Sequence, residues 1–171
     1  MSALPQASRP SLLSADALAR IERELRKFPS DQKQSAVMAA LAIAQDEHGW
    51  LSAEVMEAVA AVLDMPPIAV HEVATFYNMF DTQQPGKFKL AICTCLPCAL
   101  RDGAKAGEYL KDKLGIAYGE TTPDGVFTLK ESECQGACGD APVLLVNNKR
   151  MCSFMDNAKL DALIAELKAQ A

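Results

Sequence analysis

Five of the six cysteines in this chain fall in two short segments, and no other feature of the sequence restricts the fold so strongly. The first segment spans residues 93–98 and reads Cys-Thr-Cys-Leu-Pro-Cys, and the second spans residues 134–138 and reads Cys-Gln-Gly-Ala-Cys. Each follows a run of residues with strand character. Cysteines that only fill a core seldom gather beside glycine and proline, which mark loops. The pattern therefore predicts a site made by thiols on two loops.

Three kinds of thiol chemistry fit this spacing to different degrees. A structural zinc site commonly uses two C-x2-C pairs, and only Cys95 and Cys98 have that spacing. A thiol–disulfide oxidoreductase needs one C-x-x-C, which Cys95 and Cys98 also provide, but it leaves the second segment unused. An iron–sulfur cluster accepts a C-x4-C opening, which Cys93 and Cys98 provide. Cys134 and Cys138 would then supply the remaining two thiolates, so the cluster interpretation uses both segments.

Glycines in and beside the second segment favour the iron–sulfur interpretation. A cluster with four thiolates carries net negative charge, and backbone N–H groups directed at the sulfurs stabilise it. We expect Gly136 and Gly139 to let the chain wrap closely and turn its amides inward.

The stretches around the cysteines, residues 92–98 and 133–143, resemble the thioredoxin-like [2Fe–2S] ferredoxins, a family with a member in bacterial NADH–quinone oxidoreductase (respiratory complex I). The resemblance extends into the N-terminal half at residues 31–38, 48–52 and 72–77. It implies one [2Fe–2S] cluster whose iron is bound by Cys93, Cys98, Cys134 and Cys138. One position departs from the family, because Cys95 stands where most members have no thiol.

The resemblance also implies partners. It predicts an electron-transfer subunit that docks on an FMN- and NADH-binding flavoprotein subunit and exchanges single electrons with the flavin. A large iron–sulfur subunit of the peripheral arm is the second expected partner. The implied complex is a translocase that reduces quinone and lies on the cytoplasmic face of the inner membrane. An equivalent diaphorase subunit of an NAD-coupled hydrogenase or formate dehydrogenase is the alternative within the same family.

Motifs for nucleotide binding are absent from the sequence, so we expect no NADH oxidation from the isolated chain. There is no G-x-G-x-x-G and no G-x4-G-K-[ST]. We expect no catalytic residue in this chain and place FMN and NADH on the partner subunit alone.

Charge and hydropathy exclude two further classes of function. The 171-residue chain has a net charge of −5, and residues 1–80 hold six Lys or Arg against ten Asp or Glu, a net of −4 (6 − 10). Nucleic-acid-binding proteins show the opposite balance. No apolar run approaches the ~18 to 20 residues that cross a bilayer, and no secretory signal is visible. We therefore expect no direct membrane insertion. We also expect the chain to lie in the reducing cytoplasm, where clustered thiols bind metal or do redox chemistry.

The period of the apolar residues predicts an α+β protein with two domains after a flexible tail. The tail is residues 1–13, a small helical bundle is residues 14–82, and the second domain is residues 83–171, which the resemblance implies is a thioredoxin-like [2Fe–2S] domain. In the bundle we expect a helix over 15–27 capped by Ser14, a second capped by Ser30 or Asp31 and closed by Gly49, a third capped by Ser52, and a fourth from Pro67 to about Asn78.

The C-terminal half alternates between strand and helix patterns. Phe88, Leu90 and Ile92 predict the inward face of a first strand, which leads into the first cysteine segment. The further expected elements are a helix over 103–114, a strand over 126–130, a hairpin of 143–146 and 149–152 across Asn147-Asn148, and a helix over 156–168. This order is that of a reduced thioredoxin-like sandwich. Both cysteine segments follow strands, so they can meet at one end of the sheet.

Other chemically capable residues have simpler expected roles. His48 is expected to sit at a helix C-terminus, where the helix dipole favours it. Cys152 is expected to be an inert buried thiol. Phe76, Tyr77, Met79 and Phe80 could form a docking patch, but we expect them to pack the helical bundle onto the sheet domain.

Overall fold

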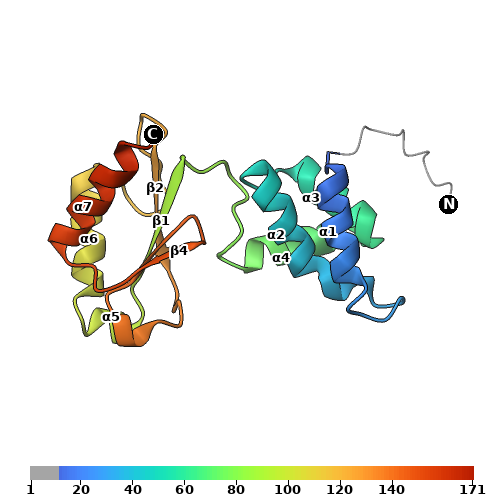
Figure 1. Cartoon of the computed structure of the whole chain (residues 1–171), viewed down its shortest axis with the longest axis horizontal. Helices are drawn as coiled ribbons and strands as arrows, with labels where there is room; N and C mark the ends of the chain where they lie inside the picture. Colours follow the sequence, from blue (N-terminus) through green and yellow to red (C-terminus); the bar gives the residue numbers. More distant parts are fainter. Residues whose placement is uncertain (1–11) are drawn as a thin grey trace. The chain divides into compact units, whose positions relative to one another are not determined.

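The computed structural model describes residues 12–171, and these form two compact units with a boundary between Gln84 and Pro85 (Figure 1). Each unit has a hydrophobic core of its own. Most of the expected tail, up to residue 11, lies outside the described residues. Leu13 is buried in the core of the first unit, so this residue belongs to the packed unit rather than to the tail.

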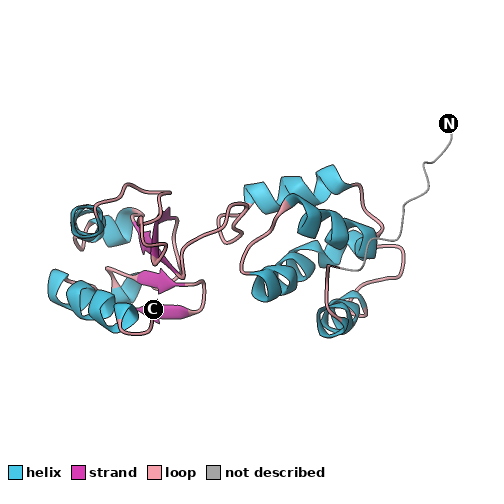
Figure 2. Ribbon diagram, turned by 90° about the horizontal axis from the view of Figure 1, so that it is seen from above, coloured by secondary structure: helices cyan, strands magenta, loops and turns pink. Residues whose placement is uncertain are grey.

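The N-terminal unit is built from helices alone in its described part (Figure 2). Helix α2 contacts α1, α3 and α4, so it is the centre of the bundle. The elements are α1 (Ala15–Leu25), the 3-10 helix η1 (Lys33–Ala36), α2 (Val37–His48), α3 (Ala53–Leu63) and α4 (Pro67–Phe76).

Three of the expected helix ends are confirmed by their backbone geometry. The hydroxyl of Ser14 accepts a hydrogen bond from the N–H of Ala17 at 3.1 Å, and Ser52 caps α3 in the same way. Such caps satisfy an N–H group that has no partner within its own helix. Gly49 ends α2 in the left-handed conformation, with φ 80°, directly after His48.

The expected cap of the second helix at Ser30 or Asp31 is wrong. Helix α2 begins at Val37 and has no side-chain cap. Residues 31–35 are exposed, and burial begins at Ala36. Because short helices depend on tertiary packing for stability, the unpacked residues form only the tighter 3-10 turn before α2.

The C-terminal unit is a four-stranded mixed sheet with helices on one face. Its strands lie in the order β2-β1-β3-β4. Strand β1 pairs with β2 in parallel and with β3 antiparallel, and β3 pairs antiparallel with β4. The elements are β1 (Phe88–Cys93), α5 (Leu96–Ala99), α6 (Gly103–Leu114), β2 (Phe127–Ser132), the 3-10 helix η2 (Cys138–Asp140), β3 (Leu144–Val146), β4 (Arg150–Cys152) and α7 (Asn157–Lys168).

The core of this unit lies between the sheet and two helices. Figure 1 shows α6 and α7 side by side along the sheet. Phe88, Leu90 and Ile92 are buried in this core, as their alternation predicts. Asn147 and Asn148 have φ of 51° and 57°, which is the geometry of a tight hairpin turn.

The α+β class is therefore confirmed, with N-terminal helices followed by a unit of a four-stranded sheet and helices. In the described residues, no helix is both long enough and apolar enough to cross a membrane.

The four residues at and after the end of α4 that could form a docking patch differ in burial. Only Phe80 is buried, and it lies in the core of the helical unit. The side chain of Phe76 is 79% exposed, and Tyr77 and Met79 are also exposed. Phe76 and Tyr77 contact each other edge to face, with ring centroids 5.0 Å apart. Packing onto the sheet domain and a docking patch both stay predictions for the exposed residues Phe76, Tyr77 and Met79.

We predict that Leu41→Ala destabilises the helical unit by about 2–5 kcal/mol, because it removes a fully buried side chain and leaves a cavity. Ile68→Ala is the matched control, since Ile68 is 64% exposed, and it should stay within about 0.5 kcal/mol of the parent. Chemical denaturation followed by helical circular dichroism measures both. Equal effects of the two substitutions would contradict this description of the core.

Candidate metal centre

Parallel pairing of β1 with β2 brings the two cysteine segments together. The register aligns Cys93, the last residue of β1, with Ser132, the last residue of β2. Parallel strands point their carboxyl ends toward the same edge of the sheet, so the loops that follow them begin side by side. The N–H of Thr94 donates to the carbonyl of Ser132 at 3.3 Å, which joins the two loops at their start.

The first thiol pair is Cys93 with Cys98, and both residues are buried. The N–H of Cys93 donates to the carbonyl of Val143 at 3.1 Å, so the sheet holds this residue. Burial raises the pKa of the Cys98 thiol, and a hydrogen bond with Cys93 raises it further. A backbone hydrogen bond from Val143 lowers the pKa of Cys98. A backbone donor is therefore already directed at this sulfur.

The second thiol pair is Cys134 with Cys138, and both residues are exposed. Their sulfur atoms lie 3.7 Å apart. The hydrogen bond and the charge of Cys134 raise the pKa of Cys138, and burial has a smaller effect in the same direction. Two thiolates about 2.3 Å from one tetrahedral metal ion lie about 3.8 Å apart, so this pair has the spacing for one metal ion.

The two pairs belong to one site. The charge of Cys93 raises the pKa of Cys138, and the charge of Cys138 raises the pKa of Cys98. Ala137, between the exposed cysteines, packs against the cluster of buried residues that includes Cys93 and Cys98. Within the described residues, no three His, Cys, Asp or Glu side chains are grouped closely enough to hold a single metal ion. The arrangement is two pairs of thiols, and an iron–sulfur centre with two irons takes two protein thiolates on each iron.

Cys95 packs against the buried cysteines, but its thiol bonds to a carboxylate. Its thiol donates to Oε2 of Glu133 at 3.2 Å. That hydrogen bond is the main cause that raises the pKa of Cys95 to about 11, and burial and the charge of Glu133 add to it. Reactive cysteines of thiol–disulfide oxidoreductases have lowered pKa values, so this direction does not suit an attacking thiol.

Two residues that the sequence did not single out position the second segment. The side-chain amide of Gln135 donates to the carbonyl of Ala91 in β1 at 2.8 Å. Val143, after the second segment, bonds to Cys93 through its carbonyl and to Cys98 through its amide. An interaction between a glutamine and a strand carbonyl leaves no periodic signal, so sequence patterns could not have found it.

The expected close wrapping at the two glycines is not observed among the protein's own atoms. A Cβ at Gly136 or at Gly139 would meet no protein atom within 4 Å. Gly136 instead has φ 78°, a left-handed conformation that disfavours any side chain. The close approach to a cysteine segment is at Gly103 instead, where an added Cβ would lie within 3.0 Å of the carbonyl oxygens of Cys93 and Cys98.

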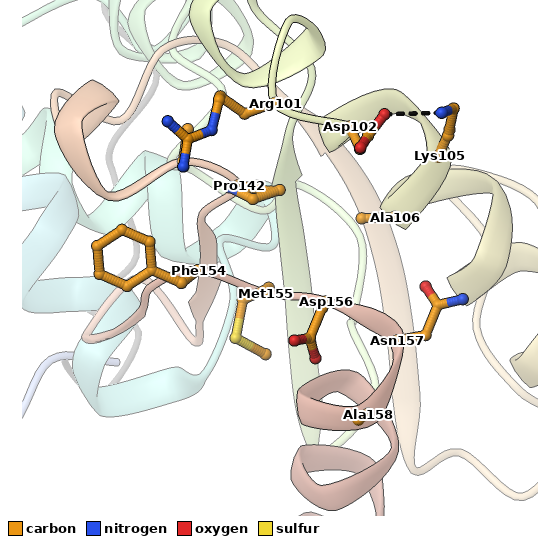
Figure 3. Close-up of a pocket in the computed structure, with 11 residues that line it drawn as sticks. Arg101, Asp102, Lys105, Ala106, Pro142, Phe154, Met155, Asp156, Asn157 and Ala158 are labelled. Atoms are coloured by element: carbon orange, nitrogen blue, oxygen red, sulfur yellow. Dashed lines mark ion pairs between the residues drawn. The ribbon is translucent and has the colours of Figure 1, made fainter.

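A cavity of about 650 Å³ opens beside the cysteine segments (Figure 3). Arg101 follows the first segment and Pro142 follows the second, and both line the cavity. Phe154 also lines it, and its N–H donates to the carbonyl of Asp140 at 2.8 Å. The cavity is therefore formed in part by residues that follow the two segments, and no cysteine lines it.

The fold and these two thiol pairs define a thioredoxin-type domain with four cysteines gathered at the carboxyl end of its parallel strands. A model of the family described as thioredoxin-like [2Fe-2S] ferredoxin matches residues 21–168. The chain belongs to this family.

Relatives of known type are similar over most of the chain. An NADH-quinone oxidoreductase subunit of Rhizobium meliloti is 43% identical over 149 residues, which are 87% of this chain and 87% of the relative. NADH-quinone oxidoreductase subunit 2 of Thermus thermophilus is 36% identical over 149 residues, which are 87% of this chain and 82% of the relative. These homologues are subunits of an oxidoreductase complex, so this chain is homologous to electron-transport subunits.

A solved structure supports the fold. An NAD+-reducing [NiFe]-hydrogenase in the air-oxidized state matches with a TM-score of 0.66 and 25% sequence identity. The match covers 76% of this chain and 23% of the hydrogenase chain, so the domain occurs there as part of a much longer protein.

We predict that Cys95 in the iron-free protein is alkylated only at high pH, because its pKa is raised to about 11 from 9.0, which lowers its thiolate fraction at pH 8 about a hundredfold. Glu133→Gln removes the carboxylate charge and replaces the charged acceptor by a weaker amide oxygen, so the midpoint of the alkylation–pH curve should fall toward 9.0. Glu131→Gln is the control, since Glu131 bonds to Thr94 instead. Peptide mass mapping across pH measures the midpoint, and an unchanged midpoint in Glu133→Gln would refute the assigned cause.

Proposed function

We propose that this chain is a one-electron carrier that binds a single [2Fe–2S] cluster through Cys93, Cys98, Cys134 and Cys138. The observation that carries the proposal is the convergence of two thiol pairs at one edge of the sheet, one of them with its sulfurs 3.7 Å apart. Membership of the [2Fe-2S] family supports it. When bound, the cluster supplies reversible one-electron transfer.

The buried thiol pair holds the site in the fold, and the exposed pair makes it accessible to a partner. Cys93 and Cys98 are buried and held by β1 and Val143, so they fix the position of the site in the fold. Cys134 and Cys138 are exposed, so electrons enter and leave on their side. The carboxylates of Glu131 and Glu133 bond to Thr94 and Cys95 at the rim. Their negative charge disfavours the gain of an electron, since the net charge helps to set the potential of such sites.

The partner that fits best is an FMN- and NADH-binding flavoprotein subunit of an NADH–quinone oxidoreductase. The names of the homologous subunits support this choice. In this arrangement NADH oxidation belongs to the partner, and this chain exchanges single electrons with the flavin. The large iron–sulfur subunit of the peripheral arm would be the second neighbour. The complex would lie at the cytoplasmic face of the membrane, and this chain would be held there by its partners.

A second candidate is the equivalent diaphorase subunit of an NAD-coupled hydrogenase or formate dehydrogenase. The likeness to an NAD+-reducing hydrogenase favours it. The two candidates share the site and differ in the subunits that accompany it. Purification of the native complex and identification of its other subunits distinguishes them, because only one assembly contains a hydrogenase or formate dehydrogenase subunit.

We predict that serine at Cys93, Cys98, Cys134 or Cys138 removes or severely perturbs the cluster, since each substitution deletes a thiolate ligand of iron. Cys95→Ser and Cys152→Ser are matched controls and should keep it. Iron and sulfide analysis with visible spectroscopy on anaerobically purified protein is the measurement. A bleached Cys95→Ser variant beside a coloured Cys93→Ser variant would show that the ligand assignment is wrong.

We predict that the exposed end of α4 contributes to binding the flavoprotein partner. Large aromatic side chains dominate the affinity of protein interfaces, and Phe76 stacks on Tyr77 at the surface. Phe76→Ala should weaken the affinity for the partner about thirtyfold, the factor that corresponds to about 2 kcal/mol. The control is Phe28→Ala, another exposed apolar residue of the same unit. Binding kinetics against the purified flavoprotein decide the matter, and unchanged affinity in Phe76→Ala would exclude this docking role.

A further inference from the structure

Gly103 lies closer to the first cysteine segment than any residue with a side chain could. It is the first residue of α6 and is buried. A Cβ at this position would lie 2.8 Å from the carbonyl oxygen of Cys98 and 2.9 Å from that of Cys93. Real Cβ atoms essentially never approach other atoms within 3.0 Å. Both oxygens belong to the backbone, so neither can rotate away as the end of a side chain would.

We propose that Gly103 is a positioning residue for the thiol pair of Cys93 and Cys98. The absence of a side chain lets the first turn of α6 pack directly on the two cysteine carbonyls, and this packing sets the separation of the two residues. The inference rests on the proposed function, because this separation matters chemically only where the pair binds iron.

The two cysteines differ in how far they can yield to a larger residue. Cys93 is held on both sides, by its register with Ser132 in β2 and by its hydrogen bond to Val143. Cys98 lies in the four-residue helix α5, and its carbonyl accepts a hydrogen bond from the N–H of Arg101 at 3.0 Å. A side chain at position 103 therefore displaces the α5 segment and moves Cys98 away from Cys93.

The size of that displacement is enough to disturb a metal site. Moving the Cys98 oxygen from 2.8 Å to an ordinary contact at 3.4 Å requires a shift of 0.6 Å (3.4 − 2.8). Binding constellations must be held within about 0.5 Å of their working geometry. A shift of this size therefore changes the separation of Cys98 from Cys93.

Two other glycines of the same unit provide matched controls. A Cβ at Gly86 would lie 2.9 Å from the carbonyl oxygen of Gly125 and 3.1 Å from backbone atoms of Phe127, but this contact is near the start of β1, away from the cysteines. A Cβ at Gly107, one turn further along α6, would meet the hydroxyl end of Tyr118, which can move aside. Gly86→Ala measures the effect of general destabilisation, and Gly107→Ala measures the effect of an added methyl group on the same helix.

The experiment compares Gly103→Ala, Gly86→Ala and Gly107→Ala in the full chain with the parent protein. We expect Gly103→Ala to lose iron to a chelator about tenfold faster or more, the range seen when residues that orient metal ligands are changed. Its electron paramagnetic resonance signal after reduction should also shift. Both controls should keep the parental rate and signal. A parental rate and signal in Gly103→Ala, or an equal loss in Gly86→Ala, overturns the inference.

A second measurement on the iron-free chain separates this inference from the proposed function. Oxidised glutathione should form the Cys93–Cys98 disulfide more slowly in Gly103→Ala than in the parent, as followed by peptide mass mapping. This result does not depend on iron. Absence of iron and sulfide from the parent protein would refute the proposed function, while equal disulfide rates in parent and variant would refute the positioning role.

The parent protein provides a test that needs no folded variant. The N–H of Arg101 donates to the carbonyl of Cys98, and the N–H of Ala106 donates to the carbonyl of Asp102. If Gly103 sets the packing, these two N–H groups should still exchange their hydrogens slowly after iron is removed. Loss of this protection together with iron would show that the cluster organises the segment, and it would overturn the inference.

Discussion

The site depends on the parallel pairing of β1 with β2. Two cysteine segments separated by a helix and a strand become neighbours because the register ends both strands at the same edge, Cys93 beside Ser132. A parallel pair requires a crossover connection, and α6 provides it while covering one face of the sheet. The same helix begins against the cysteine carbonyls at Gly103. The crossover thus both allows the pairing and packs against the first thiol pair.

Burial then gives the two pairs different roles. The pair on β1 and α5 is enclosed, and the pair on the second segment faces solvent. An electron-transfer site needs both properties, since burial fixes the geometry and limits access by water, and exposure lets a partner approach closely. Hydrogen bonds across the site join these parts, from Gln135 to Ala91 and from Cys93 to Val143. The site is therefore held mainly by backbone contacts with the sheet.

Much of this arrangement follows from the sequence. The residues that show it are Phe88, Leu90 and Ile92, whose alternation marks the central strand, and Asn147-Asn148, whose tolerance of positive φ marks the hairpin. Patterns failed where a distant contact decides the outcome. Helix α2 starts at Val37, and not after Ser30 or Asp31, because burial begins only at Ala36. Sequence patterns also did not predict the role of Gly103, because this role depends on how closely Gly103 approaches the carbonyl oxygens of Cys93 and Cys98 in the folded chain.

In the proposed function, four thiolates in two pairs bind two irons at this edge of the sheet. X-ray absorption at the iron edge, on protein purified without oxygen, measures the atoms around each iron. We expect every iron to be surrounded by sulfur alone and to have one iron atom as its next neighbour, because each iron takes two protein thiolates and two bridging sulfides. A single iron without an iron neighbour, nitrogen or oxygen among its ligands, or zinc in place of iron would contradict it.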